Sequence, residues 1–148
     1  ATMIFSVLEA ATPILLAAAG LLLAGCSPSD PPTEAAPADG EIVMERAQAR
    51  WDALVTGDHE TGYGYYSPGF REQMPLVDFT IDMRSRPVQW VAADVLSADC
   101  DGDRCTVETE VEYRVPSAPA QMSGMGNRRP IEETWIRIDD AWWFVPGA

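Results

Sequence analysis

Residues 105 to 115 have the strictest two-residue period in the chain, and this period is the strongest constraint on the fold. Every second position holds an apolar side chain or a threonine, namely Cys105, Val107, Thr109, Val111, Tyr113 and Val115. The positions between them are polar, namely Thr106, Glu108, Glu110, Glu112 and Arg114. Because successive side chains of a strand point to opposite faces of a sheet, the pattern predicts a strand with one buried and one wet face.

An apolar stripe at helical spacing lies upstream of this strand. It consists of Val43, Ala47, Trp51 and Leu54. The stripe predicts a helix that Asp39 caps and Gly57 ends, since side chains three or four residues apart share one helix face.

Two shorter helices are expected next. Asp58 is a suitable N-cap for a helix that reaches Tyr66. Gly62 lowers the helix propensity of that segment, so contacts with the rest of the protein must hold it in place. The residues Ser67-Pro68-Gly69 are expected to form a turn, and Pro75 to begin a third helix.

The spacing of apolar residues changes to two from position 87 onward. Trp90, Ala92 and Leu96 alternate along the first expected strand. Two further strands are expected over Ile131 to Ile138 and Ala141 to Val145. Three helices followed by four antiparallel strands indicate an α+β fold.

This order of elements resembles the nuclear transport factor 2-like superfamily over roughly residues 41 to 146. The resemblance rests on Trp51-Asp52-Ala53-Leu54 followed by Gly57-Asp58, on the tyrosine-rich segment before Ser67-Pro68, and on the closing Trp135 to Trp143 hairpin. It implies helices packed in a curved, cone-shaped antiparallel sheet of four or more strands. The superfamily contains enzymes, binding modules and dimerisation domains, so the resemblance implies no single function.

An apolar run from Ile14 to Ala24 precedes the expected domain. It is shorter than the ~20 apolar residues of a transmembrane helix and has the length of a signal-peptide core. The sequence Leu23-Ala24-Gly25-Cys26 ends the run and resembles the lipobox of bacterial lipoproteins. Residues 1 to 13 depart from the usual pattern, because they contain Glu9 and no basic residue.

The lipobox resemblance implies a signal peptide over residues 1–25, cleavage before Cys26 and a lipid anchor on that cysteine. Ser27 stands where Asp favours retention in the inner membrane, which implies an outer-membrane protein facing the periplasm. Residues 26–40 hold four prolines among small and acidic residues and are expected to form an extended tether. The folded domain is then expected over residues 41–148.

Cys100 and Cys105 flank a four-residue hairpin loop. Disulfides persist in compartments beyond the inner membrane, so we expect a structural disulfide between the two. A redox-active pair is not expected, because the Cys-x-x-Cys spacing is absent.

Neither the acidic residues nor the histidine predicts a metal site. Asp99, Asp101 and Asp103, with Glu110, approach the spacing of a calcium loop. The glycine stands at position 102 rather than at the sixth position of that loop, so an acidic hairpin is favoured. His59 is the only histidine and is expected at the surface, at a helix start. We therefore expect no metal and no cofactor.

The candidates for lining the interior of a cone are Trp51, Tyr63, Tyr66, Trp90, Asp94 and Trp135. Asp94 is either a buried carboxyl, of the kind that ketosteroid-isomerase-type members use, or a residue at the sheet edge. A glycine-rich loop with Met122 and Met125 either closes on a ligand or is disordered. An aromatic interior with few titratable groups favours holding an apolar group over proton transfer, so no catalytic residue is expected.

The charge balance limits the partners. All ten basic residues are arginine, against 23 acidic residues, and the net charge is −13. This balance argues against a surface that binds nucleic acid or anionic lipid headgroups by charge. We interpret the chain as a lipid-anchored accessory domain of the cell envelope that binds an apolar small molecule or an envelope protein. Two alternatives stay open: a small-molecule isomerase or cyclase, and an oligomerising module such as a homodimer.

Overall fold

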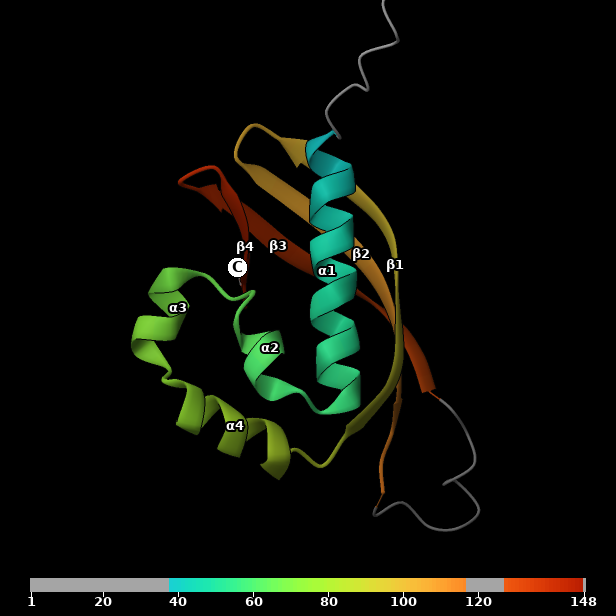
Figure 1. Cartoon of the computed structure of the whole chain (residues 1–148). Coiled ribbons are helices and arrows are strands. Elements are labelled where there is room, and N and C mark those ends of the chain that lie inside the picture. The colour runs from blue at the N-terminus through green and yellow to red at the C-terminus, as the bar shows by residue number, and fades with distance from the viewer. Residues whose placement is uncertain (1–37, 117–126, 148) are drawn as a thin grey trace, which may run out of the picture. The chain divides into compact units, whose positions relative to one another are not determined.

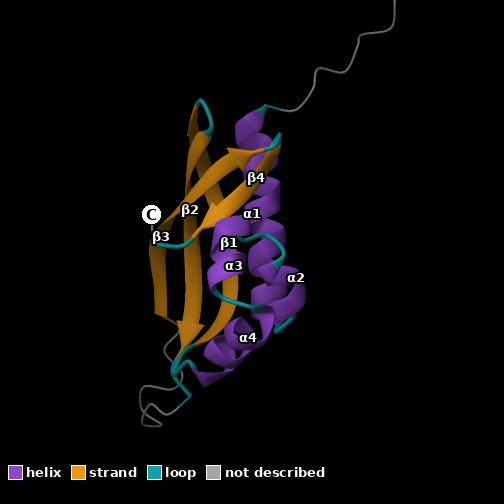
Figure 2. Cartoon of the chain, turned by 90° about the vertical axis from the view of Figure 1, so that its left-hand side faces the viewer, coloured by secondary structure: helices purple, strands orange, loops and turns teal. Residues whose placement is uncertain are grey.

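The computed structural model describes residues 38–116 and 127–147, which form one layer of helices against one antiparallel sheet (Figure 1). Figure 2 shows the two layers from the side, with the sheet bending around the longest helix. The α+β architecture with helices on a curved four-stranded sheet is thus confirmed. The expected signal peptide, the lipid site Cys26, nearly all of the tether and the loop with Met122 and Met125 lie outside the described residues.

Within the described residues, four helices precede the strands, one more than the sequence predicts. They are α1 (Asp39–Thr56), α2 (His59–Tyr63), α3 (Pro68–Gln73) and α4 (Leu76–Ser85). The prediction of a turn at Ser67-Pro68-Gly69 is wrong, because the Ser67 hydroxyl accepts a hydrogen bond from the Phe70 N–H and caps α3. None of the helices in the two described ranges has the length and apolar character needed to cross a bilayer.

Two helix starts differ in how well the sequence predicts them. Asp58 caps α2 as expected, and hydrogen bonds from the side chain and backbone N–H of Thr61 lower the pKa of its carboxyl. Asp39 instead lies inside α1, whose N-cap is Ala38. The Glu41 carboxylate accepts a hydrogen bond from the Ala38 N–H, so a residue without a capping side chain still begins the helix.

The strands follow in sequence order across the sheet as β1 (Gln89–Asp101), β2 (Arg104–Arg114), β3 (Asn127–Ile138) and β4 (Ala141–Val145). Every neighbouring pair is antiparallel, so β1 and β4 form the edges. In β2, the alternating residues from Cys105 to Val111 are buried, which agrees with the predicted wet and dry faces. The loop after α2 is joined to β4 by hydrogen bonds between Tyr65, Ser67 and Phe144.

Strand β1 does not keep the single alternation that the sequence suggests. Its pairing with β2 shifts between Trp90 and Ala92 and again between Val95 and Ser97. Each β-bulge places one extra residue in the strand and reverses which side chains face inward. Leu96, expected on the same face as Trp90, is consequently 52% exposed on the outer face.

The core lies between α1 and the concave face of the sheet. It contains Val43, Ala47, Trp51, Leu54, Tyr66, Phe79, Val107, Val111, Trp135, Trp142 and Phe144. All four α1 members of this cluster come from the predicted apolar stripe, so the helical period identifies the buried face. Phe79 from α4 packs against Tyr63 and Tyr66 and thereby joins the smaller helices to this core.

A charged pair is buried in this core. The Arg50 guanidinium of α1 donates a hydrogen bond of 2.8 Å to the Glu133 carboxylate of β3, and both side chains are less than 5% exposed. The guanidinium also lies 3.8 Å from the ring centroid of Phe144 and 5.2 Å from that of Tyr66. These contacts fix α1 over the middle of the sheet.

The start of α1 is tied to the β1–β2 hairpin at one end of the domain. Arg137 of β3 binds Asp39 of α1 at 3.0 Å and Asp103 of the hairpin at 2.8 Å. The hydrogen bond with Asp103 and the charge of Asp39 raise the pKa of Arg137. The same hairpin carries a disulfide between Cys100 and Cys105, which face each other across β1 and β2.

Gly62 lets α2 approach α1 closely. A Cβ at this position would lie 2.6 Å from Cδ2 and 3.0 Å from Cγ of Leu54, which is itself buried. We predict that Gly62→Ala lowers the free energy of unfolding by about 1–3 kcal/mol, because Leu54 must move within a packed core. Urea denaturation followed by tryptophan fluorescence measures the change.

The matched control is Gly69→Ala in α3, where an added Cβ meets no atom within 4 Å. This variant should be as stable as the wild type or more stable by up to about 1 kcal/mol, since alanine restricts the unfolded chain. Equal stability of the Gly62 and Gly69 variants would show that the close approach is not required.

Glu133 and its sequence neighbour Glu132 give a second test. Glu133→Ala leaves the Arg50 guanidinium buried without its carboxylate, and should cost about 3–5 kcal/mol of unfolding free energy. Glu132 points to the exposed face, so Glu132→Ala should change stability by about 0.5 kcal/mol or less. Thermal and urea unfolding of both variants provide the measurement, and a loss of similar size in both would contradict the prediction.

Candidate functional site

A pocket of about 500 Å³ opens between α1 and the sheet, at the end of the domain where α4 leads into β1. Its walls are Trp51, Arg86, Pro87, Val88, Trp90, Val111, Tyr113, Arg129 and Ile131. This volume lies within the ~300–1,000 Å³ typical of small-molecule sites. The lining is mostly aromatic and aliphatic, with two arginines among the walls.

Two tryptophans form one wall of this pocket. Trp51 comes from the second half of α1 and Trp90 from the start of β1. Their rings meet edge to face, with centroids 5.1 Å apart and planes at 82°. The Arg86 guanidinium lies 5.5 Å from the Trp90 centroid. Because the Trp51 backbone is held by the adjacent Arg50–Glu133 pair, this wall is built on a rigid part of the fold.

Of the six candidates from the sequence, only Trp51 and Trp90 line this pocket. Tyr66 lies in the aromatic core instead, beside a cavity of about 130 Å³ next to α3 and α4. The single proton of the Tyr63 hydroxyl is shared between the carbonyl oxygens of Met74, at 2.8 Å, and Arg71, at 3.2 Å. It therefore serves to hold the segment between α3 and α4, and the expectation that Tyr63 faces a ligand is wrong.

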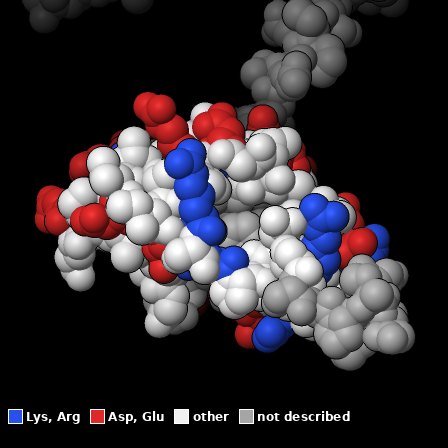
Figure 3. All heavy atoms as spheres, turned by 90° about the horizontal axis from the view of Figure 1, so that it is seen from below, with Lys and Arg blue, Asp and Glu red and all other residues white. Residues whose placement is uncertain are grey.

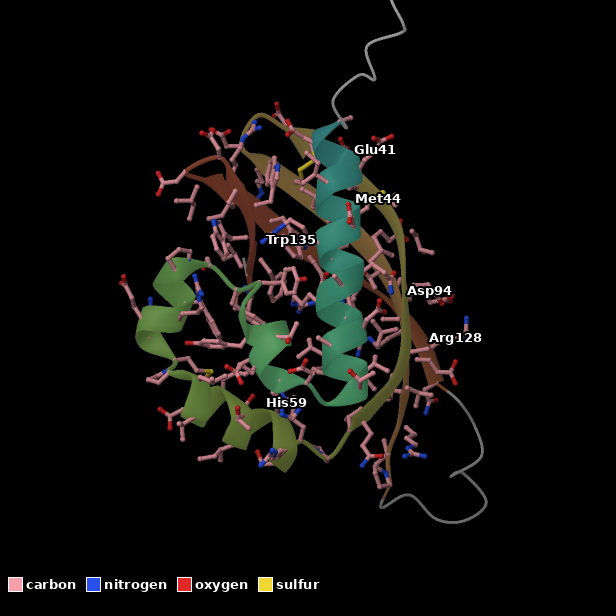
Figure 4. The ribbon with its side chains drawn as sticks, viewed as in Figure 1. Glu41, Met44, His59, Asp94, Arg128 and Trp135 are labelled. Atoms are coloured by element: carbon pink, nitrogen blue, oxygen red, sulfur yellow. A yellow bond between two sulfur atoms is a disulfide. The ribbon has the colours of Figure 1, made fainter. Side chains whose placement is uncertain are left out.

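Trp135 and Asp94 also lie elsewhere, as Figure 4 shows. Trp135 is fully buried between the sheet and α1, where it packs on Phe144. Asp94 is exposed on the outer face of β1, opposite Glu110 of β2. Of the two placements expected for Asp94, the buried carboxyl is wrong and the sheet edge is right, since β1 is an edge strand and the bulge between Trp90 and Ala92 reverses the facing of the residues that follow.

A second cavity of about 400 Å³ adjoins the first. The two share Arg86, Val88 and Trp90. The second cavity is more polar, because Arg84, Arg114, His59 and Gln89 line it together with residues from the end of α1. Sequence reasoning missed these arginines, since they are far apart in the chain and only the fold brings them together.

The arginines at this end differ in their partners. Arg86 binds Asp82 at 2.7 Å, and Arg114 donates a hydrogen bond to the side-chain oxygen of Gln89 at 2.9 Å. Figure 3 views this end of the domain and shows blue side chains on both sides of a hollow. Within the described ranges, Arg84 and Arg129 have no acidic partner within 4 Å, so their charges are available to a ligand.

Arg128 belongs to the outer face rather than to the cavities. It binds Glu110 at 3.2 Å and Glu112 at 3.0 Å, and the hydrogen bond with Glu112 raises its pKa. Glu110 is thereby engaged on the sheet surface, and Asp103 is engaged with Arg137. The calcium-like spacing of the acidic residues therefore corresponds to a hairpin and a strand, and no group of three metal-ligating side chains assembles in the described part of the chain.

His59 lies between the start of α2 and α4, as labelled in Figure 4. It is partly buried rather than fully at the surface, and its Nδ1 has no hydrogen-bond partner among the described residues. The side chain lines the polar cavity together with Arg84. A histidine among arginines offers a hydrogen-bond donor or acceptor to a ligand there.

The described walls of both cavities contain no Asp or Glu side chain. Proton abstraction would need a base within hydrogen-bond reach of the substrate, and the groups present are arginines, Tyr113 and His59. The arrangement is suited to binding a ligand in which an apolar part lies next to a negatively charged group.

Comparisons with known proteins show a structural similarity at the level of the fold. No protein-family model matches the chain, and no curated protein sequence matches it. A SEC-C motif-containing protein from Rhodopseudomonas palustris is 17% identical with a TM-score of 0.52, and the match covers 67% of this chain and 71% of that protein. Another from Psychrobacter arcticus is 14% identical with a TM-score of 0.56, over 77% of this chain and 63% of that protein.

Proteins described as NTF2-like are also among the similar structures. One from Streptomyces avermitilis is 17% identical with a TM-score of 0.48, over 70% of this chain and 90% of that protein. The two SEC-C motif-containing proteins, with TM-scores above 0.5, share the fold with the chain.

Proposed function

We propose that the domain binds an apolar small molecule in the pocket walled by Trp51 and Trp90, and that it does so without catalysis. The observation that carries this proposal is the pocket itself, whose size and aromatic walls fit a small ligand. The lining also contains Val111 and Ile131 from the middle strands, so apolar surface surrounds the ligand on two sides. The absence of carboxylates from the described walls favours binding over an isomerase or cyclase reaction.

We further propose that the domain is held on a membrane of the cell envelope by a lipid on Cys26. The support comes from the sequence: the apolar run Ile14 to Ala24, the motif Leu23-Ala24-Gly25-Cys26 and the proline-rich stretch that follows. An acyl chain adds about 0.8 kcal/mol of membrane affinity per buried methylene, and more than one chain gives stable attachment.

The pocket is tested with a neutral fluorescent probe, N-phenyl-1-naphthylamine, whose emission rises in apolar surroundings. The protein is the whole chain carrying Cys26→Ser, purified without detergent. Trp90→Ala in this background should lower the affinity for the probe about tenfold, because the loss of one aromatic wall forfeits roughly 1.5 kcal/mol of apolar contact. Fluorescence titration gives the affinity.

Leu96→Ala is the matched control, since Leu96 lies on the same strand but on the outer face. It should leave the affinity unchanged, and circular dichroism should find both variants folded. Equal probe affinity for the Trp90→Ala variant and its parent chain would contradict the proposed function.

The anchor is tested by growing cells that express the chain with an alkyne analogue of palmitate. The wild type should incorporate the label and fractionate with membranes, whereas Cys26→Ser should incorporate none. Cys100→Ser combined with Cys105→Ser serves as the control and should keep the label, because these cysteines pair with each other in the domain. Label on the Cys26→Ser protein would exclude this cysteine as the lipid site.

A further inference from the structure

We infer that the ligand is a single-chain amphiphile with one anionic headgroup, such as a fatty carboxylate or an alkyl phosphate. Its chain lies in the tryptophan-walled pocket and its head in the adjoining polar cavity. This inference rests on the proposed function and names the chemical class of ligand for that site.

The first support is a separation of charge within the domain. Acidic residues outnumber basic ones by 23 to 10 in the chain, yet the described walls of the two cavities hold four arginines and no Asp or Glu. The four are Arg84, Arg86, Arg114 and Arg129. Acidic side chains gather instead on the outer face of the sheet, for example Glu108 opposite Glu132. The cavities are therefore a local positive region on an acidic protein, and the positive electrostatic potential of such a region attracts an anion.

The second support is the connection between the two cavities. Arg86, Val88 and Trp90 belong to the walls of both, so the two cavities adjoin, and a ligand that extends along this shared wall reaches from the apolar lining to the polar one. Arg86 is partly neutralised by Asp82, whereas Arg84 has no acidic partner within 4 Å among the described residues. Arg84 and Arg114 thus stand beyond the shared wall, where the headgroup would lie.

The third support is the chemistry of the side chains. The guanidinium group presents two parallel N–H donors to a carboxylate or phosphate, and charge-assisted hydrogen bonds of this kind are about twice as strong as neutral ones. His59 and Gln89 add further polar atoms to the same cavity. An anionic headgroup supplies charged acceptors for these donors, which an uncharged ligand does not.

The experiment measures displacement of N-phenyl-1-naphthylamine from the Cys26→Ser chain by three compounds of equal chain length, each below its micelle concentration. They are dodecanoate, dodecanol and dodecyltrimethylammonium, and dodecyl phosphate is a fourth arm that tests the other anionic headgroup. Dodecanoate or dodecyl phosphate should displace the probe at about tenfold lower concentration than dodecanol, and the cationic compound should be the weakest.

Arginine variants locate the headgroup. Arg84→Gln with Arg114→Gln should lower the affinity for the anionic compounds about tenfold, and leave dodecanol and the probe unchanged. Arg104→Gln removes one arginine charge at the start of β2, outside both cavities, and should change none of the affinities.

Two outcomes would overturn the inference while leaving the pocket in place: equal displacement by dodecanoate and dodecanol, or an equal loss for both in the double arginine variant. Binding to phosphatidylglycerol vesicles without displacement by monomeric dodecanoate would also overturn it, because the site would then recognise a membrane surface. Failure of the neutral probe to bind would instead count against the proposed function.

Discussion

The ion pair between Arg50 and Glu133 determines where the long helix lies on the sheet. Burying two charges is costly, and the cost is offset only when the partners and the surrounding rings hold a fixed geometry. Here the guanidinium has one carboxylate and the faces of Phe144, Tyr66 and Trp51 within reach. A shift of α1 along the sheet would separate the charges in a nonpolar environment. The pair therefore fixes the position of α1 along the sheet. Trp51, the next residue, is placed at the pocket as a result.

The sequence allowed the fold class and the core to be predicted better than the site. The alternation around Val107 and the helical stripe through Ala47 correspond to the two faces that meet in the core. The facing of Asp94 was beyond prediction, because it depends on bulges whose positions are set by pairing with β2. The first turn of α3 was missed because a Ser-Pro-Gly sequence suits both a turn and a capped helix start.

The arginines show a second limit of sequence reasoning. Net charge describes the whole chain, whereas a ligand meets only the side chains near it. Arg84 and Arg114 are separated by an entire strand and most of another, and they line one cavity because β1 and β2 run antiparallel and return to the same end. The pocket tryptophans share this property, since they come from α1 and β1. In sites of this kind the fold brings together residues that are distant in the sequence. Such residues form no short sequence motif by which the site could be recognised.

The position of the first residue of α1 has a consequence for access to the pocket. The chain enters the domain at Asp39, beside the disulfide-closed hairpin, while the pocket lies near the other end of a helix that is about 27 Å long. The chain therefore joins the domain at the end opposite the pocket. A ligand can consequently reach the pocket without passing the point where the chain enters the domain.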